Sequence, residues 1–243
     1  MSEMTSAPGA HGATPPPLLE PPPVVTSSSG TQAGSAAPAE PLVPWISIWT
    51  RPRATLRQIL DSDPRRSVYR LAALGGVAGA LRLASTSGFG DTHPASVVLV
   101  VCIAGGAVGG ILALFLLTSL VGLAGRWLGG QGRMSAVMAA LAWSYAPAIW
   151  GLALWLPRAA LLGEKTFQSL PATIEGNPPA ALLFGFLQLA HDLIGIWGFL
   201  ITLKCIAEAE RFSAWRAFGA FVLAGLMVGV PVGLVLVALQ ALS

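Results

Sequence analysis

The chain has 243 residues, of which 54% are hydrophobic and only 10% are charged. A soluble domain of average composition carries about 25% charged residues, so these charges cannot cover a water-soluble globule of this size. The formal net charge of +3 comes from basic residues that lie mainly at the edges of apolar runs. They therefore indicate membrane boundaries and not nucleic-acid binding. Cys102 and Cys205 are isolated and predict neither a metal site nor a disulfide framework.

Residues 1–43 are rich in Pro, Ser and Ala, with three consecutive prolines at 15–17 and again at 21–23. Such a segment has little to bury and favours short polyproline II pieces, which predicts a disordered cytoplasmic tail. A partner that recognises proline-rich peptides is the alternative to a plain solvated tail. Residues 44–243 are expected to form one membrane domain.

The first element of that domain is predicted at residues 44–62. Its aromatic and apolar positions recur at helical spacing, and arginines stand on the opposite face. This pattern is typical of a helix that lies in the headgroup region of a bilayer and contacts lipid or a partner protein. The alternative is a helix packed on the loops of the bundle. The candidate contact surface consists of Trp45, Ile48, Trp49, Arg53, Leu56, Ile59 and Leu60.

Apolar segments follow at residues 67–86, 95–125, 135–156, 179–203 and 217–242. Each is close to or above the roughly 20 residues that a helix needs to cross a hydrocarbon core. Helices satisfy every backbone group in lipid, so the predicted fold class is all-α, a polytopic bundle of five transmembrane helices. The first segment is the weakest because Arg70 and Arg82 interrupt it. Pro147 and Pro231 lie inside spans and are expected to bend them.

Basic residues predict the orientation of the spans. They precede the first span and recur in the loops between spans two and three and between spans four and five. The segment 88–94 has none, and the predicted loop from Pro157 to Pro178 has only Arg158 and Lys165. Basic loops remain in the cytoplasm, which predicts a cytoplasmic N-terminus and an outside C-terminus.

Glycines recur every fourth residue within the spans, a spacing that lets two helix backbones approach closely. These repeats predict packing within the bundle. The alternative is self-association, or contact with other membrane proteins, through the same faces. The repeats are Gly75 with Gly79, Gly105 with Gly109, Gly106 with Gly110, and Gly225 with Gly229 and Gly233.

Arg82, His191 and Asp192 form a candidate intramembrane polar cluster, because ionisable groups at membrane depth are costly and mark functional sites. Asp192 lies roughly 16 Å from the cytoplasmic end of its span, and Arg82 roughly 22 Å from the end of its own. An arginine side chain can bridge that difference. We therefore expect the two to form a buried pair or to share polar contacts. The pair fixes helix register, or it forms part of an ion or proton path.

Catalytic motifs are absent from the sequence. It contains no HExxH metal site, no GxSxG nucleophile elbow and no Gly-rich phosphate loop. Asp91 and His93 share one extramembrane loop, but two side chains do not make a metal site. The expectation is a protein that is not an enzyme and needs no cofactor.

Three segments recur in a characteristic order along the chain. They are PWISIWTRPRATLRQILDSDP before the first span, ALAWSYAPAIW at 140–150, and HDLIGIWGFLITLKCIAEAERFSAWRA at 191–217. With these segments the chain resembles the Ypt-interacting protein (Yip) domain family in its bacterial form. The resemblance runs from Pro44 to the C-terminus and omits the tail, and it implies five membrane helices and a cytoplasmic N-terminus.

We therefore predict a non-catalytic protein of a bacterial inner membrane that acts as a scaffold or membrane-organising factor. Its partners are the lipid bilayer and other membrane proteins. The alternative is a small transporter or channel that uses Asp192, His191 and Arg82. Water-filled or substrate-sized space around Asp192 favours transport, whereas a dry and closely packed pair favours the scaffold.

Overall fold

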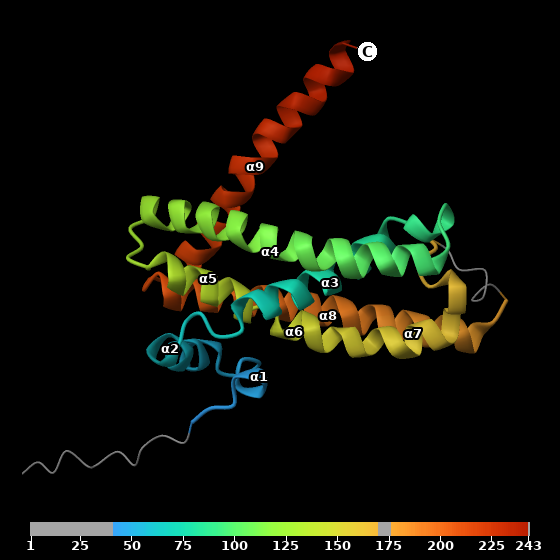
Figure 1. Cartoon of the computed structure of the whole chain (residues 1–243), viewed down its shortest axis with the longest axis horizontal. Helices are drawn as coiled ribbons and strands as arrows, with labels where there is room; N and C mark the ends of the chain where they lie inside the picture. The colour runs from blue at the N-terminus through green and yellow to red at the C-terminus, as the bar shows by residue number, and fades with distance from the viewer. Residues whose placement is uncertain (1–40, 170–175, 243) are drawn as a thin grey trace, which may run out of the picture. The chain divides into compact units, whose positions relative to one another are not determined.

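The computed structural model describes residues 41–169 and 176–242 (Figure 1). Residues 1–40 of the predicted tail lie outside the described residues. All regular structure in the described part of the chain is helical, which confirms the all-α class. The helices are α1 (Pro44–Ser47), α2 (Pro52–Ser62), α3 (Val68–Thr86), α4 (Ala95–Trp127), α5 (Met134–Trp143), α6 (Ala146–Gly151), α7 (Trp155–Leu162), α8 (Pro178–Ala209) and α9 (Ala214–Leu242), with 3₁₀ turns η1 (Phe89–Asp91), η2 (Leu152–Leu154) and η3 (Gly163–Lys165).

Four helical segments of the described chain are long and apolar enough to cross a membrane. These are Ala95–Trp127, Met134–Lys165, Pro178–Ala209 and Ala214–Gln240. The chain is therefore an integral membrane protein, and four of the predicted spans have counterparts in the structure. Helix α3, the counterpart of the first predicted span, is not among the four. Its crossing of the membrane remains a prediction.

The third apolar segment differs most from its predicted form. The expected span of residues 135–156 divides at Ser144 and Tyr145 into α5 and α6, close to Pro147. A proline inside a helix removes one backbone bond and collides with the carbonyl four residues earlier, which here belongs to Trp143. The helical path then continues through η2, α7 and η3 as far as Lys165. The prediction of a loop from Pro157 to Pro178 was therefore wrong for its first residues, and Arg158 is a buried residue of α7.

Helices α3 and α4 cross where glycines leave no room for side chains. A Cβ atom on Gly76 would meet the backbone of Gly106 and Gly110, and one on Gly110 would meet the carbonyl oxygen of Ala72. The Gly106–Gly110 repeat thus serves packing within the chain. On the same helix, a Cβ on Gly105 or Gly109 would meet nothing within 4 Å.

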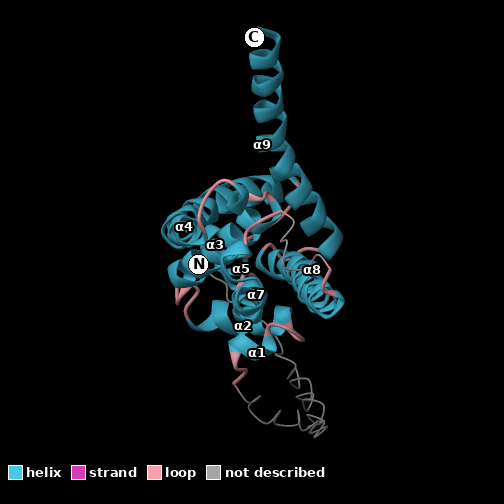
Figure 2. Cartoon of the chain, turned by 90° about the vertical axis from the view of Figure 1, so that its right-hand side faces the viewer, coloured by secondary structure: helices cyan, strands magenta, loops and turns pink. Residues whose placement is uncertain are grey.

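The last part of α9 leaves the other helices (Figures 1 and 2). From Val228 to Leu239 every residue is exposed, and most of these side chains are aliphatic. A Cβ on Gly225, Gly229 or Gly233 would meet nothing within 4 Å. This repeat does not pack within the described chain, and its role in self-association remains a prediction.

Candidate functional site

Arg82 of α3 and Asp192 of α8 meet in the structure. The Nη2 atom of Arg82 donates to Oδ1 of Asp192 over 2.7 Å. Each of the two side chains is 43% exposed, so the expectation of a buried pair was wrong in this respect. The pair therefore lies at the surface of the bundle. Depth along the two helices predicted the partners, but it carried no information on which way they face.

Three further polar side chains extend this contact into a ring. Arg158 of α7 donates from Nη2 to the Oγ of Ser85 over 2.6 Å and from Nη1 to Oε1 of Gln188 over 3.0 Å. Gln188 in turn donates from Nε2 to Asp192 over 3.3 Å. We call Arg82, Ser85, Arg158, Gln188 and Asp192 the polar ring. It connects α3, α7 and α8.

Arg158 is the buried member of the ring, with only 4% of its surface exposed. Its guanidinium carbon lies 5.2 Å from the ring centre of Trp155 and 4.8 Å from that of Phe184. Two aromatic faces and two hydrogen bonds replace part of the water that a buried cation loses, while the Nε atom of Arg158 is buried without a hydrogen-bond partner. The sequence prediction missed both Arg158 and Gln188. The spacing of Gln188, one helical turn before Asp192, was the signal that pointed to a shared helix face.

His191, the third predicted member of the cluster, lies beside the ring and is not hydrogen-bonded to Asp192. Its imidazole packs edge-on against Trp155, with ring centres 5.5 Å apart. Its Nδ1 atom is buried without a hydrogen-bond partner. The hydrogen bonds of Asp192 come from the guanidinium of Arg82 and from the amide of Gln188, and neither is a carboxylate or imidazole that could pass a proton on. These contacts offer no step for a proton relay.

The hollow beside the buried side of the ring is very small. The cavity lined by Arg82, Ser85, Arg158, Gln188 and His191 has a volume of about 10 Å³. A buried water molecule needs at least about 10–15 Å³ measured in this way. This hollow therefore holds one water at most, whereas Arg82 and Asp192 are partly exposed at the surface of the bundle. Among the described residues no three His, Cys, Asp or Glu side chains gather as metal ligands.

The second predicted surface, on α1 and α2, faces the bundle. Ile48 and Leu56 are fully buried, and Ile59 is 5% exposed. They pack on residues of α5, α6 and α8, including Ala140, Ala146, Ile201 and Cys205. The apolar stripe is therefore not available to lipid or to a partner, which corrects the prediction. An apolar stripe requires burial, and the neighbouring helices provide it here.

The remaining residues of that predicted surface also have partners within the bundle or border a cavity. Trp45 lies edge-on to Trp143, with ring centres 5.7 Å apart, and Trp197 donates its indole N–H to the backbone oxygen of Trp49 over 3.1 Å. Leu60 is partly buried, whereas Arg53 is exposed. Both line a cavity beside α2.

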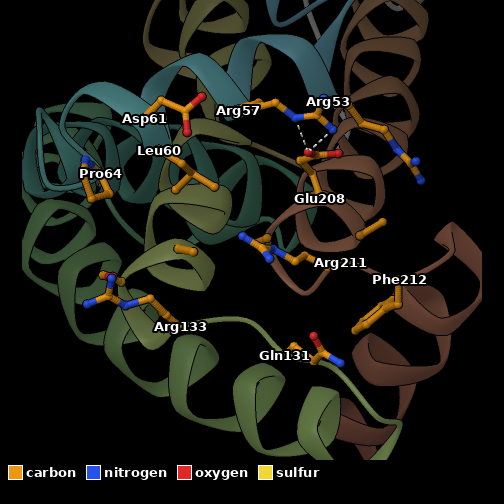
Figure 3. A pocket seen from close by; sticks show the side chains of 14 residues that line it. Arg53, Arg57, Leu60, Asp61, Pro64, Gln131, Arg133, Glu208, Arg211 and Phe212 are labelled. Carbon is orange, nitrogen blue, oxygen red and sulfur yellow. Dashed lines mark hydrogen bonds and ion pairs between the residues drawn. The ribbon is translucent and has the colours of Figure 1, made fainter. Parts of the chain in front are cut away.

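That cavity measures about 840 Å³ and lies where α2, the start of α5 and the α8–α9 turn meet (Figure 3). We call it the basic cavity, because four arginines line it. Arg57 is neutralised by Glu208, with its Nη2 atom 2.6 Å from Oε1. The other three have no side-chain hydrogen bond or ion pair among the residues that the structure describes. They are Arg53, Arg133 and Arg211.

Glu210 holds two sides of the basic cavity in place. It is 1% exposed, and its Oε2 atom accepts the backbone N–H of Gly132 over 3.0 Å. Its own backbone oxygen accepts the N–H of Gln131 over 3.1 Å. A Cβ at Gly125, Gly130 or Gly132 would collide with its carboxylate. This glycine-lined contact fixes the α4–α5 loop, and with it Arg133, against the α8–α9 turn that carries Arg211.

Comparison with protein families gives one match. A family model described as the Yip1 domain matches residues 46–237. Comparison with curated proteins and with solved structures found no match for the chain.

Proposed function

The chain belongs to the Yip1 domain family, and on that basis we propose that it is a non-catalytic scaffold or membrane-organising factor of a bacterial inner membrane. The observation that carries the proposal is the polar ring. Two arginines and an aspartate at membrane depth are committed to contacts between helices, around a cavity of about 10 Å³. A ring of this kind positions helices relative to one another.

The proposal includes five spans, with α3 as the first. Its 19 residues extend about 28 Å, close to the roughly 30 Å of a hydrocarbon core. Of its two arginines, Arg82 is paired with Asp192, and Arg70 lies within one turn of the helix start, from where its side chain reaches the membrane surface. The charges that weaken α3 as a span are thus compensated.

The proposed orientation rests on the basic cavity. Arg57 precedes the first span, Arg133 lies between spans two and three, and Arg211 lies between spans four and five, yet all three line one cavity. The three basic segments therefore share one end of the bundle. Basic loops remain cytoplasmic, which supports a cytoplasmic N-terminus and, with five spans, an outside C-terminus.

Proximity labelling in the native host tests the scaffold role. A labelling enzyme fused to the N-terminus is expected to mark a reproducible set of membrane proteins, enriched over an unrelated membrane protein carrying the same enzyme at equal abundance. The Leu56→Ala variant, which weakens the packing of α2 on the bundle, is expected to label a reduced set. A labelling pattern identical to that of the unrelated protein contradicts the proposal.

A further inference from the structure

The side chains that line the basic cavity carry more positive than negative charge, and the buried carboxylate of Glu210 lies behind its wall. Its lining carries four arginines and two carboxylates, those of Asp61 and Glu208, and one arginine–carboxylate pair is already formed. Arg53, Arg133 and Arg211 come from three separate segments and border the same cavity; in Figure 3 the guanidinium groups of Arg133 and Arg211 lie on one side of Glu208 and that of Arg53 on the other. Arginines without a partner are suited to bind phosphate, because the guanidinium matches phosphate oxygens.

The backbone at Arg211 adds an independent observation. Helix α8 ends in a Schellman motif, in which Phe212 N–H donates to Ala207 O over 3.0 Å and Arg211 N–H donates to Glu208 O over 3.3 Å. This motif places Arg211 in the left-handed region, at φ +57°. Glycine occupies such a position without strain, whereas a residue with a Cβ atom does not. Arg211 therefore adopts this conformation at a conformational cost, at the point where its side chain borders the cavity.

Exposed tryptophans place this end of the bundle at the level of lipid headgroups. Trp127 ends α4 with 65% of its surface exposed, and Trp215 lies in the first turn of α9 with 83% exposed. Tryptophan is enriched at both membrane–water interfaces. The cavity lining also includes apolar groups, among them Leu60 and Phe212. A ligand with an anionic head and apolar chains matches that combination.

We infer that the basic cavity binds the phosphate-bearing headgroup of an anionic phospholipid. Arg133 and Arg211 contact the phosphate, Arg53 borders the opening from α2, and the acyl chains lie along the apolar surface of the bundle. The volume of about 840 Å³ accommodates a glycerol-based headgroup. This inference rests on the proposed placement of this end of the bundle at the cytoplasmic membrane surface. It names the lipid class that the α2 region contacts.

Binding of dioctanoyl phosphatidylglycerol to the purified full-length protein in detergent tests the inference, with calorimetry as the readout. The variant Arg133→Gln/Arg211→Gly is expected to lose about 30-fold in affinity, at about tenfold per 1.4 kcal/mol and about 1 kcal/mol per arginine. The matched control Arg66→Gln/Arg70→Gln removes two exposed charges outside the cavity and is expected to stay within about threefold of wild type. Glycine suits the φ of residue 211, so Arg211→Gly alone is expected to unfold no earlier than wild type.

Three outcomes overturn the inference. An equal loss in the control variant means that only general charge attraction operates. Equally tight binding of dioctanoyl phosphatidylcholine means that the anionic charge is not recognised. Inorganic phosphate binding as tightly as the lipid means a site for free anions. Each of these outcomes leaves the labelling pattern in the host, and hence the scaffold proposal, unaffected.

Discussion

Replacing Arg158 by lysine tests whether the polar ring holds the bundle together. The substitution keeps the positive charge but removes the planar fork that donates to both Ser85 and Gln188. An ammonium group at the end of a lysine reaches one of these acceptors and stacks less well between Trp155 and Phe184. We expect Arg158→Lys to destabilise the protein without changing its net charge.

The magnitude follows from the contacts. One lost hydrogen bond from a charged donor costs about 1.5–3 kcal/mol, and the weakened aromatic stacking adds about 0.5–2 kcal/mol. The expected loss in free energy of unfolding is therefore about 2–5 kcal/mol. Unfolding of the full chain by SDS in mixed micelles, followed by tryptophan fluorescence, measures it. Arg66→Lys is the matched control, because the exposed Arg66 side chain has no partner among the described residues.

Ser85→Ala completes the test, since it removes the acceptor 2.6 Å from Arg158. Combined with Arg158→Lys, it is expected to cost less than the sum of the two single changes. The reasoning is refuted if Arg158→Lys and Arg66→Lys agree within about 0.5 kcal/mol, the usual spread of surface substitutions.

Three further predictions follow from the same contacts. Arg82→Gln and Asp192→Asn are each expected to lower the free energy of unfolding, with a coupling of about 1 kcal/mol in the double variant, the upper end for exposed pairs; strict additivity would show that the pair contributes nothing. Leu56→Ala is expected to lower the free energy of unfolding by about 2–5 kcal/mol because Leu56 is fully buried, whereas Ile46→Ala, at a site 67% exposed, is expected to be nearly neutral. Equal effects of the two substitutions would mean that the apolar stripe of α2 faces lipid and not the bundle. A reporter enzyme that is active only outside the cytoplasm is expected to be active when fused after Ser243, and activity of a cytoplasm-only reporter there would rule out five spans with a cytoplasmic N-terminus.

Hydropathy predicted most of the membrane helices because span length and apolar composition are properties of the local sequence. Depth along two helices was enough to predict the Arg82–Asp192 contact. It did not predict exposure, which depends on how the helices turn about their axes. Arg158 was assigned to a loop because Pro157 was taken as the end of the span. In the structure Pro157 lies in the first turn of α7, where a proline lacks no needed N–H.

The amphipathic pattern of α2 was recognised, but its environment was not. An apolar stripe opposed by arginines is compatible with a bilayer surface and with a neighbouring helix, because both bury the stripe. The basic cavity could not be predicted, since its arginines lie up to 158 positions apart, from Arg53 to Arg211 (211 − 53 = 158). Only the packing of α2, α5 and α8 brings them to one place.

Ion flux through reconstituted protein tests the central claim most directly. Vesicles containing the full chain and a trapped pH-sensitive dye are compared with protein-free vesicles and with vesicles containing Asp192→Asn. A polar ring that positions helices predicts that all three exchange protons at the same rate. Faster exchange through the wild-type protein that disappears in Asp192→Asn would contradict the account and make Asp192 part of a transport path.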